Sequence, residues 1–277
     1  RGVLGMLTGS RDYPGAALMS VRAALNTGVG MVRFNGKDDT LRTLMLGQNP
    51  ETVCFTGPPA HEHVHAWAGG SGTGPETLDH NRYLLNAPEP AILDAGAVDL
   101  AADYLMAGHS LGEHKILTPH AGELERFLRR IHEHSPQRWE EMLDGALVPS
   151  REDINAEPFR WVRAACELSG ATVMLKGSTT LIAAPVGATY SVHGATGWLA
   201  TAGSGDTLTG ILGALLAQYM AAAQERHEQV EGCTYASIAA LAVYLHNRAA
   251  LASLEGRKGP VPPSRVAAYL PQAIAEL

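Results

Sequence analysis

A glycine-rich loop that leads into a predicted helix carries the side chains best suited to chemistry. Residues 197–206 are Gly-Trp-Leu-Ala-Thr-Ala-Gly-Ser-Gly-Asp. The apolar residues that follow recur at helical spacing, at Leu208, Ile211, Leu212, Leu215, Leu216 and Tyr219. The first turn of a helix presents unpaired backbone N–H groups and the positive end of the helix dipole, and small residues let an anion approach them. The loop is therefore a candidate anion-binding site.

Asp206 stands at the start of this predicted helix. A carboxylate next to a bound phosphate is electrostatically unfavourable unless it has a chemical task, such as taking a proton from a hydroxyl group that attacks phosphorus. The alternative is a helix cap, because Ser and Asp are favoured at that position. The Gly-Ser-Gly-Asp sequence by itself leaves both interpretations open.

The elements that must position this loop alternate between strand and helix in the first half of the chain. A small-residue helix is predicted over 16–26. Apolar runs that end in Gly, Asp, Thr or His predict strands at 3–7, 31–34, 64–68, 91–94 and 115–118. Polar residues at the carboxyl edge of a parallel sheet are placed where open α/β folds bind ligands.

The second half of the chain predicts a different arrangement. Closely spaced strands indicate a small antiparallel section, at 172–176, 181–184 and 190–192, and helices follow at 207–225, 234–253 and 265–275. Residues 129–158 are polar and proline-containing, which predicts an exposed insertion. We expect residues 1–277 to form a single α/β domain, in which helices flank a central, mostly parallel sheet and the C-terminal part is helical.

Composition narrows the class of protein. The chain has 277 residues, of which 45% are hydrophobic and 18% charged, as in an ordinary globular protein. A net charge of −7 argues against nucleic acid or an anionic membrane as the main partner. The three cysteines have no zinc spacing, and no membrane span or signal peptide is visible, so a cytoplasmic location is predicted. The chain begins at Arg1 on a predicted strand, and we expect an N-terminal piece to precede it.

Four motifs follow one another along the chain. They are Gly-Ser and Tyr-Pro-Gly-Ala-Ala within 9–17, Leu-Thr-Pro-His-Ala-Gly-Glu at 117–123, Leu-Lys-Gly-Ser-Thr-Thr at 175–180, and Ala-Thr-Ala-Gly-Ser-Gly-Asp at 200–206. In this order they resemble the NAD(P)H-hydrate dehydratase family, which has a ribokinase-like fold. The last motif is shared with ribokinase-like kinases in general, whereas the Thr-Pro-His segment is far more specific.

The resemblance implies a metabolite-repair lyase. Such an enzyme dehydrates (6S)-hydrated NADH or NADPH back to NAD(P)H through a phosphorylated intermediate, and yields AMP and phosphate. Gly-Ser-Gly-Asp resembles the bacterial branch, for which ADP is the expected nucleotide, with ATP possible, together with Mg²⁺. The resemblance also implies an NAD(P)H-hydrate epimerase as a possible partner and a homo-oligomer such as a tetramer.

The resemblance assigns nucleotide-side roles residue by residue. Asp206 is expected to be the catalytic base, and the phosphoryl anion hole is expected at Ala202, Gly203, Ser204 and Gly205. Nucleotide contacts are expected from Gly205 and from the loop made of Lys176, Gly177, Ser178, Thr179 and Thr180. The nucleotide should therefore lie between these two loops. Without the resemblance, a solvent-facing lysine at a strand end is the commoner outcome for Lys176.

Substrate contacts are expected from Ala16, Ala17, Gly74, His120 and Asp206. Because strand-to-helix junctions of a parallel sheet converge on its carboxyl edge, we expect Ala17, Gly74 and His120 to line one pocket beside Asp206. Close packing of a helix on the sheet would also require small residues at Ala16 and Ala17, and a lone histidine such as His120 more often has a structural role. The glycine loop at 69–74 matches the family's motif only loosely.

The metal ligands are not fixed by the sequence. Glu123 could contact a metal or stabilise the first turn of its helix, with equal weight. Asp94 could hold magnesium through water or cap a helix that begins near Ala97, and the structural role is slightly favoured. His61, His63 and His65 would share one strand face, but no acid or cysteine completes a zinc site there, so zinc is not favoured.

Two other functions are consistent with the same motifs. One is a ribokinase-like small-molecule kinase that phosphorylates a thiazole or pyrimidine alcohol to a stable product. The other is a nucleotide-binding module without catalysis, which would need the phosphate-binding loop but not Asp206.

Overall fold

The computed structural model describes residues 1–74, 77–187 and 189–277. Within these residues, nine strands form one sheet in the order β3-β2-β1-β4-β5-β6-β7-β8-β9. The strands from β3 to β7 in this order pair in parallel. Strand β8 pairs antiparallel with β7, and β9 pairs antiparallel with β8. Their bounds are β1 Val3–Leu7, β2 Met31–Asn35, β3 Val53–Phe55, β4 Ala66–Gly69, β5 Ala91–Leu93, β6 Lys115–Leu117, β7 Thr172–Leu175, β8 Thr180–Ala183 and β9 Thr189–Val192. The predicted fold class is confirmed, and β3 is a strand that the sequence pattern did not reveal.

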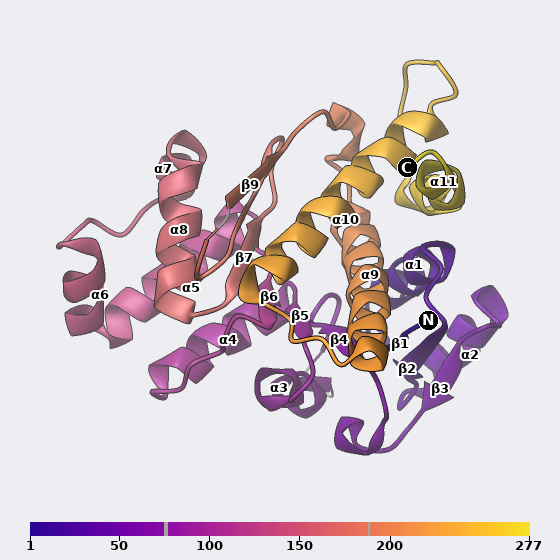
Figure 1. Cartoon of the computed structure of the whole chain (residues 1–277), viewed down its shortest axis with the longest axis horizontal. Coiled ribbons are helices and arrows are strands. Elements are labelled where there is room, and N and C mark those ends of the chain that lie inside the picture. The colour runs from indigo at the N-terminus through magenta and orange to yellow at the C-terminus, as the bar shows by residue number, and fades with distance from the viewer. Residues whose placement is uncertain (75–76, 188) are drawn as a thin grey trace.

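Helices cover both faces of the sheet (Figure 1). One face packs against α1 (Pro14–Asn26), α2 (Asp39–Gln48), α9 (Ser204–Arg226), α10 (Gly232–Ser253) and α11 (Pro263–Ala275). The other packs against α3 (Leu78–Asn86), α4 (Gly96–Met106), α5 (Ala121–His134), α6 (Pro136–Leu143), α7 (Arg151–Ala156) and α8 (Pro158–Ser169). The strands alternate between the two cores: Ile92 faces the first, whereas Ala91 and Leu93 face the second.

The segment 129–158 is largely exposed, as its polar composition predicted, but it is mostly helical and is anchored to the core. It contains the end of α5 and the whole of α6 and α7, and its apolar side chains join the core: Trp139 is 2% exposed and Ile154 is fully buried. The Trp139 indole N–H donates to the Ala146 carbonyl at 2.7 Å, which closes the connection after α6. A few well-placed apolar residues therefore anchor a segment whose other residues are polar.

Two local features position the functional loops. Helix α9 begins at Ser204, three residues earlier than predicted, so Asp206 lies in its first turn. Gly210 lets α9 approach α1, because a Cβ added there would lie 2.1 Å from the Ser20 carbonyl oxygen. Within the described residues, none of the helices combines the length and apolar composition that crossing a membrane requires.

Candidate active site

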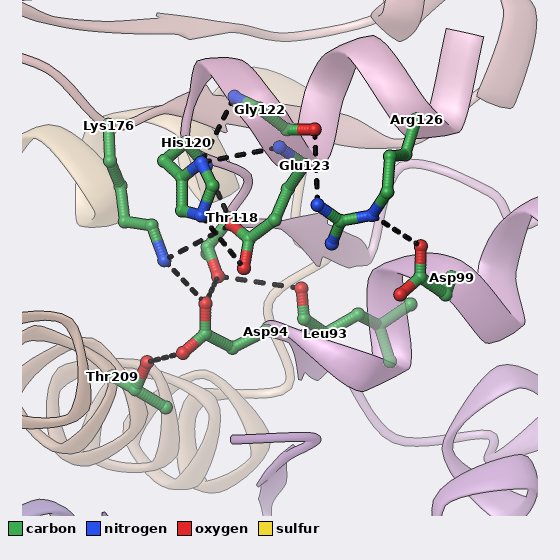
Figure 2. A network of polar contacts seen from close by, with 10 residues as sticks. All are labelled: Leu93, Asp94, Asp99, Thr118, His120, Gly122, Glu123, Arg126, Lys176 and Thr209. Atoms are coloured by element: carbon green, nitrogen blue, oxygen red, sulfur yellow. Dashed lines mark hydrogen bonds and ion pairs between the residues drawn. The ribbon is translucent and has the colours of Figure 1, made fainter. Parts of the chain in front are cut away.

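Three adjacent strands each end at a residue that contributes to one polar cluster (Figure 2). Asp94, Thr118 and Lys176 are the first residues after β5, β6 and β7, which are neighbours in the sheet. The Lys176 ammonium lies 2.6 Å from Asp94 Oδ1 and 3.9 Å from Glu123 Oε2. Burial opposes the charge on Lys176, but Asp94, Glu123 and Asp206 outweigh that effect and raise its pKa. Lys176 is thus a charged lysine directed inward, not toward solvent.

Asp94 holds this cluster together. It is 2% exposed, and besides Lys176 it accepts hydrogen bonds from the Thr118 hydroxyl at 2.8 Å and the Thr209 hydroxyl at 3.1 Å. Because Thr209 belongs to α9, Asp94 ties three strand ends to the helix that carries Asp206. The expected helix-capping role is wrong: α4 starts after Ala95 without any side-chain cap, because both Asp94 oxygens already have partners.

His120 and Glu123 form a capping box at the start of α5. The His120 Nδ1 accepts from the backbone N–H of Gly122 and of Glu123, and Glu123 Oε2 accepts from the His120 N–H at 2.8 Å. The capping interpretation of Glu123 is therefore confirmed. The same carboxylate also faces Lys176, so the capping box fixes one wall of the cluster.

A cavity of about 610 Å³ opens between the two predicted nucleotide loops. One side is formed by His120 and by Lys176, Gly177, Ser178 and Thr180, and the other by residues 195–197, 199–202 and 204–205. A Cβ added to Gly205 would lie 3.6 Å from the Lys176 ammonium, so the start of α9 and this lysine are neighbours. Thr179 and Gly203 belong to the same loops but do not line the cavity. The positive end of α9 and a lysine thus face one space, as an anion site requires.

The third wall of this cavity comes from α10. Leu208 of α9 is joined there by Val243, His246 and Asn247. Sequence reasoning missed these three residues, because they lie within an apolar helical stretch that carries no motif.

Asp206 is half-buried next to this cavity, in the first turn of α9. The N-cap residue of the helix is Gly203, with φ 91°, so Asp206 is not the capping residue. Burial raises the pKa of Asp206, Asp94 adds to the rise, and the Ser71 hydroxyl and the Lys176 ammonium oppose it. A carboxylate held at a raised pKa in a cleft has the properties of a general base.

The raised pKa predicts a pH-dependent stability difference. Folding disfavours the charged carboxylate, so its contribution to stability is present at low pH and is lost as the pH rises through the folded-state pKa of Asp206. We expect Asp206→Asn to increase the free energy of unfolding at neutral pH and to change it little below the usual carboxyl range. Urea unfolding at several pH values measures this. A variant that is less stable at neutral pH would contradict it.

The predicted substrate residues lie at different strand ends, and the two alanines among them pack closely. Ala17 is fully buried against Gly9, and Ala16 packs against Gly72, as the packing interpretation requires. His120 instead lines the cavity with Lys176. The Ala17 side chain is therefore a packing residue, and the expectation that Ala17, Gly74 and His120 line one substrate pocket stays a prediction.

A second cavity, of about 200 Å³, lies at the carboxyl ends of β1 and β2. Its lining includes Gly9, Ser10, Asn35, Lys37 and Thr77. The Gly9 N–H donates to the Ser71 carbonyl at 2.8 Å, and Ser71 in turn faces Asp206. Gly74 lies close to this side of the molecule, since its carbonyl accepts hydrogen bonds from Thr77. Asp206 thus stands between the cavity on the Lys176 side and the ends of β1 and β2.

The sheet and this site define the class of protein. The fold is ribokinase-like, and a structure of ADP/ATP-dependent NAD(P)H-hydrate dehydratase from Bacillus subtilis, co-crystallised with ATP and Mg²⁺ and soaked with CoA, superposes with a TM-score of 0.74. That chain is 25% identical, and the match covers 99% of this chain and 92% of the Bacillus chain. A hydroxyethylthiazole kinase from Pyrococcus horikoshii is 14% identical with a TM-score of 0.63, so it shares the fold.

The chain belongs to the NAD(P)H-hydrate dehydratase family, whose model matches residues 4–272. The bifunctional NAD(P)H-hydrate repair enzyme Nnr of Mycobacterium tuberculosis is 37% identical over 221 residues, covering 78% of this chain and 41% of that enzyme. The ADP-dependent (S)-NAD(P)H-hydrate dehydratase of Neisseria meningitidis is 32% identical, covering 78% of this chain and 70% of the relative. The chain spans about half or less of the length of the repair enzymes that it matches, 41% in Mycobacterium tuberculosis and 52% in Mycobacterium leprae.

Proposed function

We propose that this protein is an ADP-dependent dehydratase that restores NADH or NADPH from the (6S)-hydrated dinucleotide. The observation that carries the proposal is the cavity that unites the Lys176 loop with the start of α9, next to a half-buried carboxylate at a raised pKa. This geometry suits phosphoryl transfer to a hydroxyl group. In the substrate that the family name implies, this is the hydroxyl at C6 of the hydrated ring.

Each part of the site has a task in that reaction. The backbone N–H groups at the start of α9, in Ala202, Gly203, Ser204 and Gly205, bind phosphate oxygens, and Lys176 balances their charge. Asp206 takes the proton of the C6 hydroxyl while the hydroxyl oxygen bonds to the terminal phosphorus of ADP. The bond between that phosphorus and the oxygen that leaves with AMP breaks in the same step. Phosphate then leaves C6 while a proton leaves the neighbouring carbon, which restores the ring double bond.

Magnesium is the metal that the family implies, and we tested whether the residues fit it. Across residues 1–74, 77–187 and 189–277, no three His, Cys, Asp or Glu side chains are grouped so that they could hold a metal ion. The Asp94 and Glu123 carboxylates have protein donors already. These residues do not form an all-protein cage. Mg²⁺ commonly binds through substrate phosphates and one or two carboxylates, so bound ADP would supply most of its ligands here.

The remaining parts of the proposal concern specificity and partners. ADP is favoured over ATP because the Neisseria relative is named as ADP-dependent. A cytoplasmic location, an NAD(P)H-hydrate epimerase as partner, and a homo-oligomer such as a tetramer complete it. The bifunctional relatives support a second activity acting on the same metabolite.

The direct test is to incubate the protein with hydrated NADH, Mg²⁺ and either ADP or ATP. We expect the dihydronicotinamide absorbance to return with ADP, together with stoichiometric AMP and phosphate. Hydrated NADH without nucleotide is the control. Accumulation of a stable phosphorylated alcohol would favour a small-molecule kinase, and nucleotide binding without turnover would favour a non-catalytic module.

A further inference from the structure

The α10 wall of the 610 Å³ cavity carries two polar side chains, His246 and Asn247, and one of them has a buried nitrogen without a hydrogen-bond partner among the described residues. His246 is 5% exposed, and its Nε2 is buried with no hydrogen bond to any described residue. Asn247 is 7% exposed and also lines the cavity. Leaving a buried polar group unpaired is unfavourable, and most buried polar groups in proteins have a partner, so such a group calls for an explanation.

The position of these residues relates them to the anion site. Val243, His246 and Asn247 are three and four residues apart, so they share one face of α10, and this face lines the cavity. Lys176 and the start of α9, where phosphates would bind, line the same cavity. A nucleotide held there by its phosphates would extend its base toward α10, between the apolar side chains of Leu208 and Val243.

We propose that Asn247 and His246 recognise the adenine base of the nucleotide and set its specificity over guanine. This inference rests on the proposed function, because it needs a nucleotide in the cavity. An amide side chain offers one acceptor and one donor, which pair with the adenine amino group and N7. Guanine presents two acceptors at the same edge, O6 and N7, so an amide cannot satisfy both.

The protonation state of His246 suits this role. Burial lowers the pKa of His246 to about 4, so at neutral pH its ring is an uncharged group with one N–H donor and one acceptor nitrogen. An uncharged ring can hydrogen-bond a base without repelling the Lys176 ammonium. Two neutral donor–acceptor groups on one helix face therefore form a site for a heteroaromatic base.

The test compares ADP and GDP binding by calorimetry in the unmodified chain and in Asn247→Ala. We expect the unmodified chain to prefer ADP by about tenfold to a hundredfold, and the variant to lose most of that preference through weaker ADP binding at unchanged GDP binding. Arg248→Ala is the matched control, because Arg248 is the next residue of α10 but faces out and pairs with Glu276 at 2.9 Å. It should alter neither affinity more than about twofold.

Two further outcomes separate the possible failures. An Asn247→Ala variant that weakens ADP and GDP equally, or neither, overturns the base-recognition inference and leaves the proposed function standing. If the unmodified chain binds neither ADP nor GDP, both the base-recognition inference and the proposed function are refuted. Adenine also occurs in the dinucleotide substrate, so the KM for hydrated NADH at saturating ADP is measured as well. A rise in that KM with unchanged ADP affinity would assign the site to the substrate and overturn the inference.

A second variant tests His246 without depending on Asn247. His246→Leu introduces an apolar side chain of similar bulk and removes the unpartnered nitrogen. We expect a higher Tm without nucleotide, because an unsatisfied buried group is gone. The increase in Tm that ADP produces should become smaller, because a contact to the base is lost. An unchanged ADP-induced increase would show that His246 is only a packing residue.

Discussion

Asp206→Asn should reduce dehydratase turnover by about a hundredfold to ten-thousandfold, the range that a positioned general base contributes. Asparagine has the size of aspartate but cannot take the proton of the C6 hydroxyl. Asp206 is not the N-cap of α9, so the helix start and its anion hole should remain intact. Nucleotide affinity should stay the same or rise slightly, because a negative charge near the phosphates is removed. Single-turnover kinetics and ADP calorimetry measure the two effects.

Asp99→Asn is the matched control for this substitution. Asp99 lies on α4, is 34% exposed and pairs with Arg126 and Arg130, away from Lys176. Its variant should keep full turnover. Near-normal turnover in Asp206→Asn would refute Asp206 as the base, and loss of the folded state would make it a structural residue.

Asp94→Ala should lower the free energy of unfolding by about 3 kcal/mol. Removing one partner of a buried ion pair costs about 3–5 kcal/mol, because the other charge is left buried and unpaired. We expect the lower end of this range, since the Lys176 side chain keeps 19% of its exposure. The hydroxyls of Thr118 and Thr209 also lose their acceptor. Urea unfolding measures the change, and ADP binding should weaken because Lys176 and α9 lose their common anchor.

A double variant distinguishes the ion pair from general disruption. Lys176→Met in the Asp94→Ala background removes the unpaired charge, so stability should partly recover, whereas independent effects would add. Asp99→Ala again serves as control: its ion pairs are half-exposed, and such pairs contribute about 1 kcal/mol or less. If Asp99→Ala lowered the free energy of unfolding as much as Asp94→Ala does, the special contribution of the buried Asp94–Lys176 pair would be refuted.

The sequence by itself determined every strand except β3, the helices of the C-terminal part, and which loops can bind an anion. Apolar runs and the polar residues that end them predicted β1, β2, β4, β5 and β6, because the burial pattern of a short segment can be read within that segment. The glycines and Asp206, followed by an apolar helical face, indicate where α9 starts, because this signal lies within one short segment. The family motifs added roles to these positions. Composition correctly predicted that residues 129–158 are mostly exposed, but not that Trp139 is buried, because that burial depends on partners elsewhere in the chain.

Only the tertiary structure decided which of these residues meet. Lys176 and Asp94 are 82 positions apart, and they pair because β5, β6 and β7 are adjacent in the sheet. Strand order also places two strands, β4 and β5, between β6, which His120 follows, and β1, which precedes the α1 helix that carries Ala17. The α10 wall carries no local signal, since His246 becomes a candidate contact only when α10 packs beside α9 and closes the cavity. Local patterns report which side chains of a segment can share a buried face, whereas a site is built from long-range packing that minimises buried unpaired charge and polar groups.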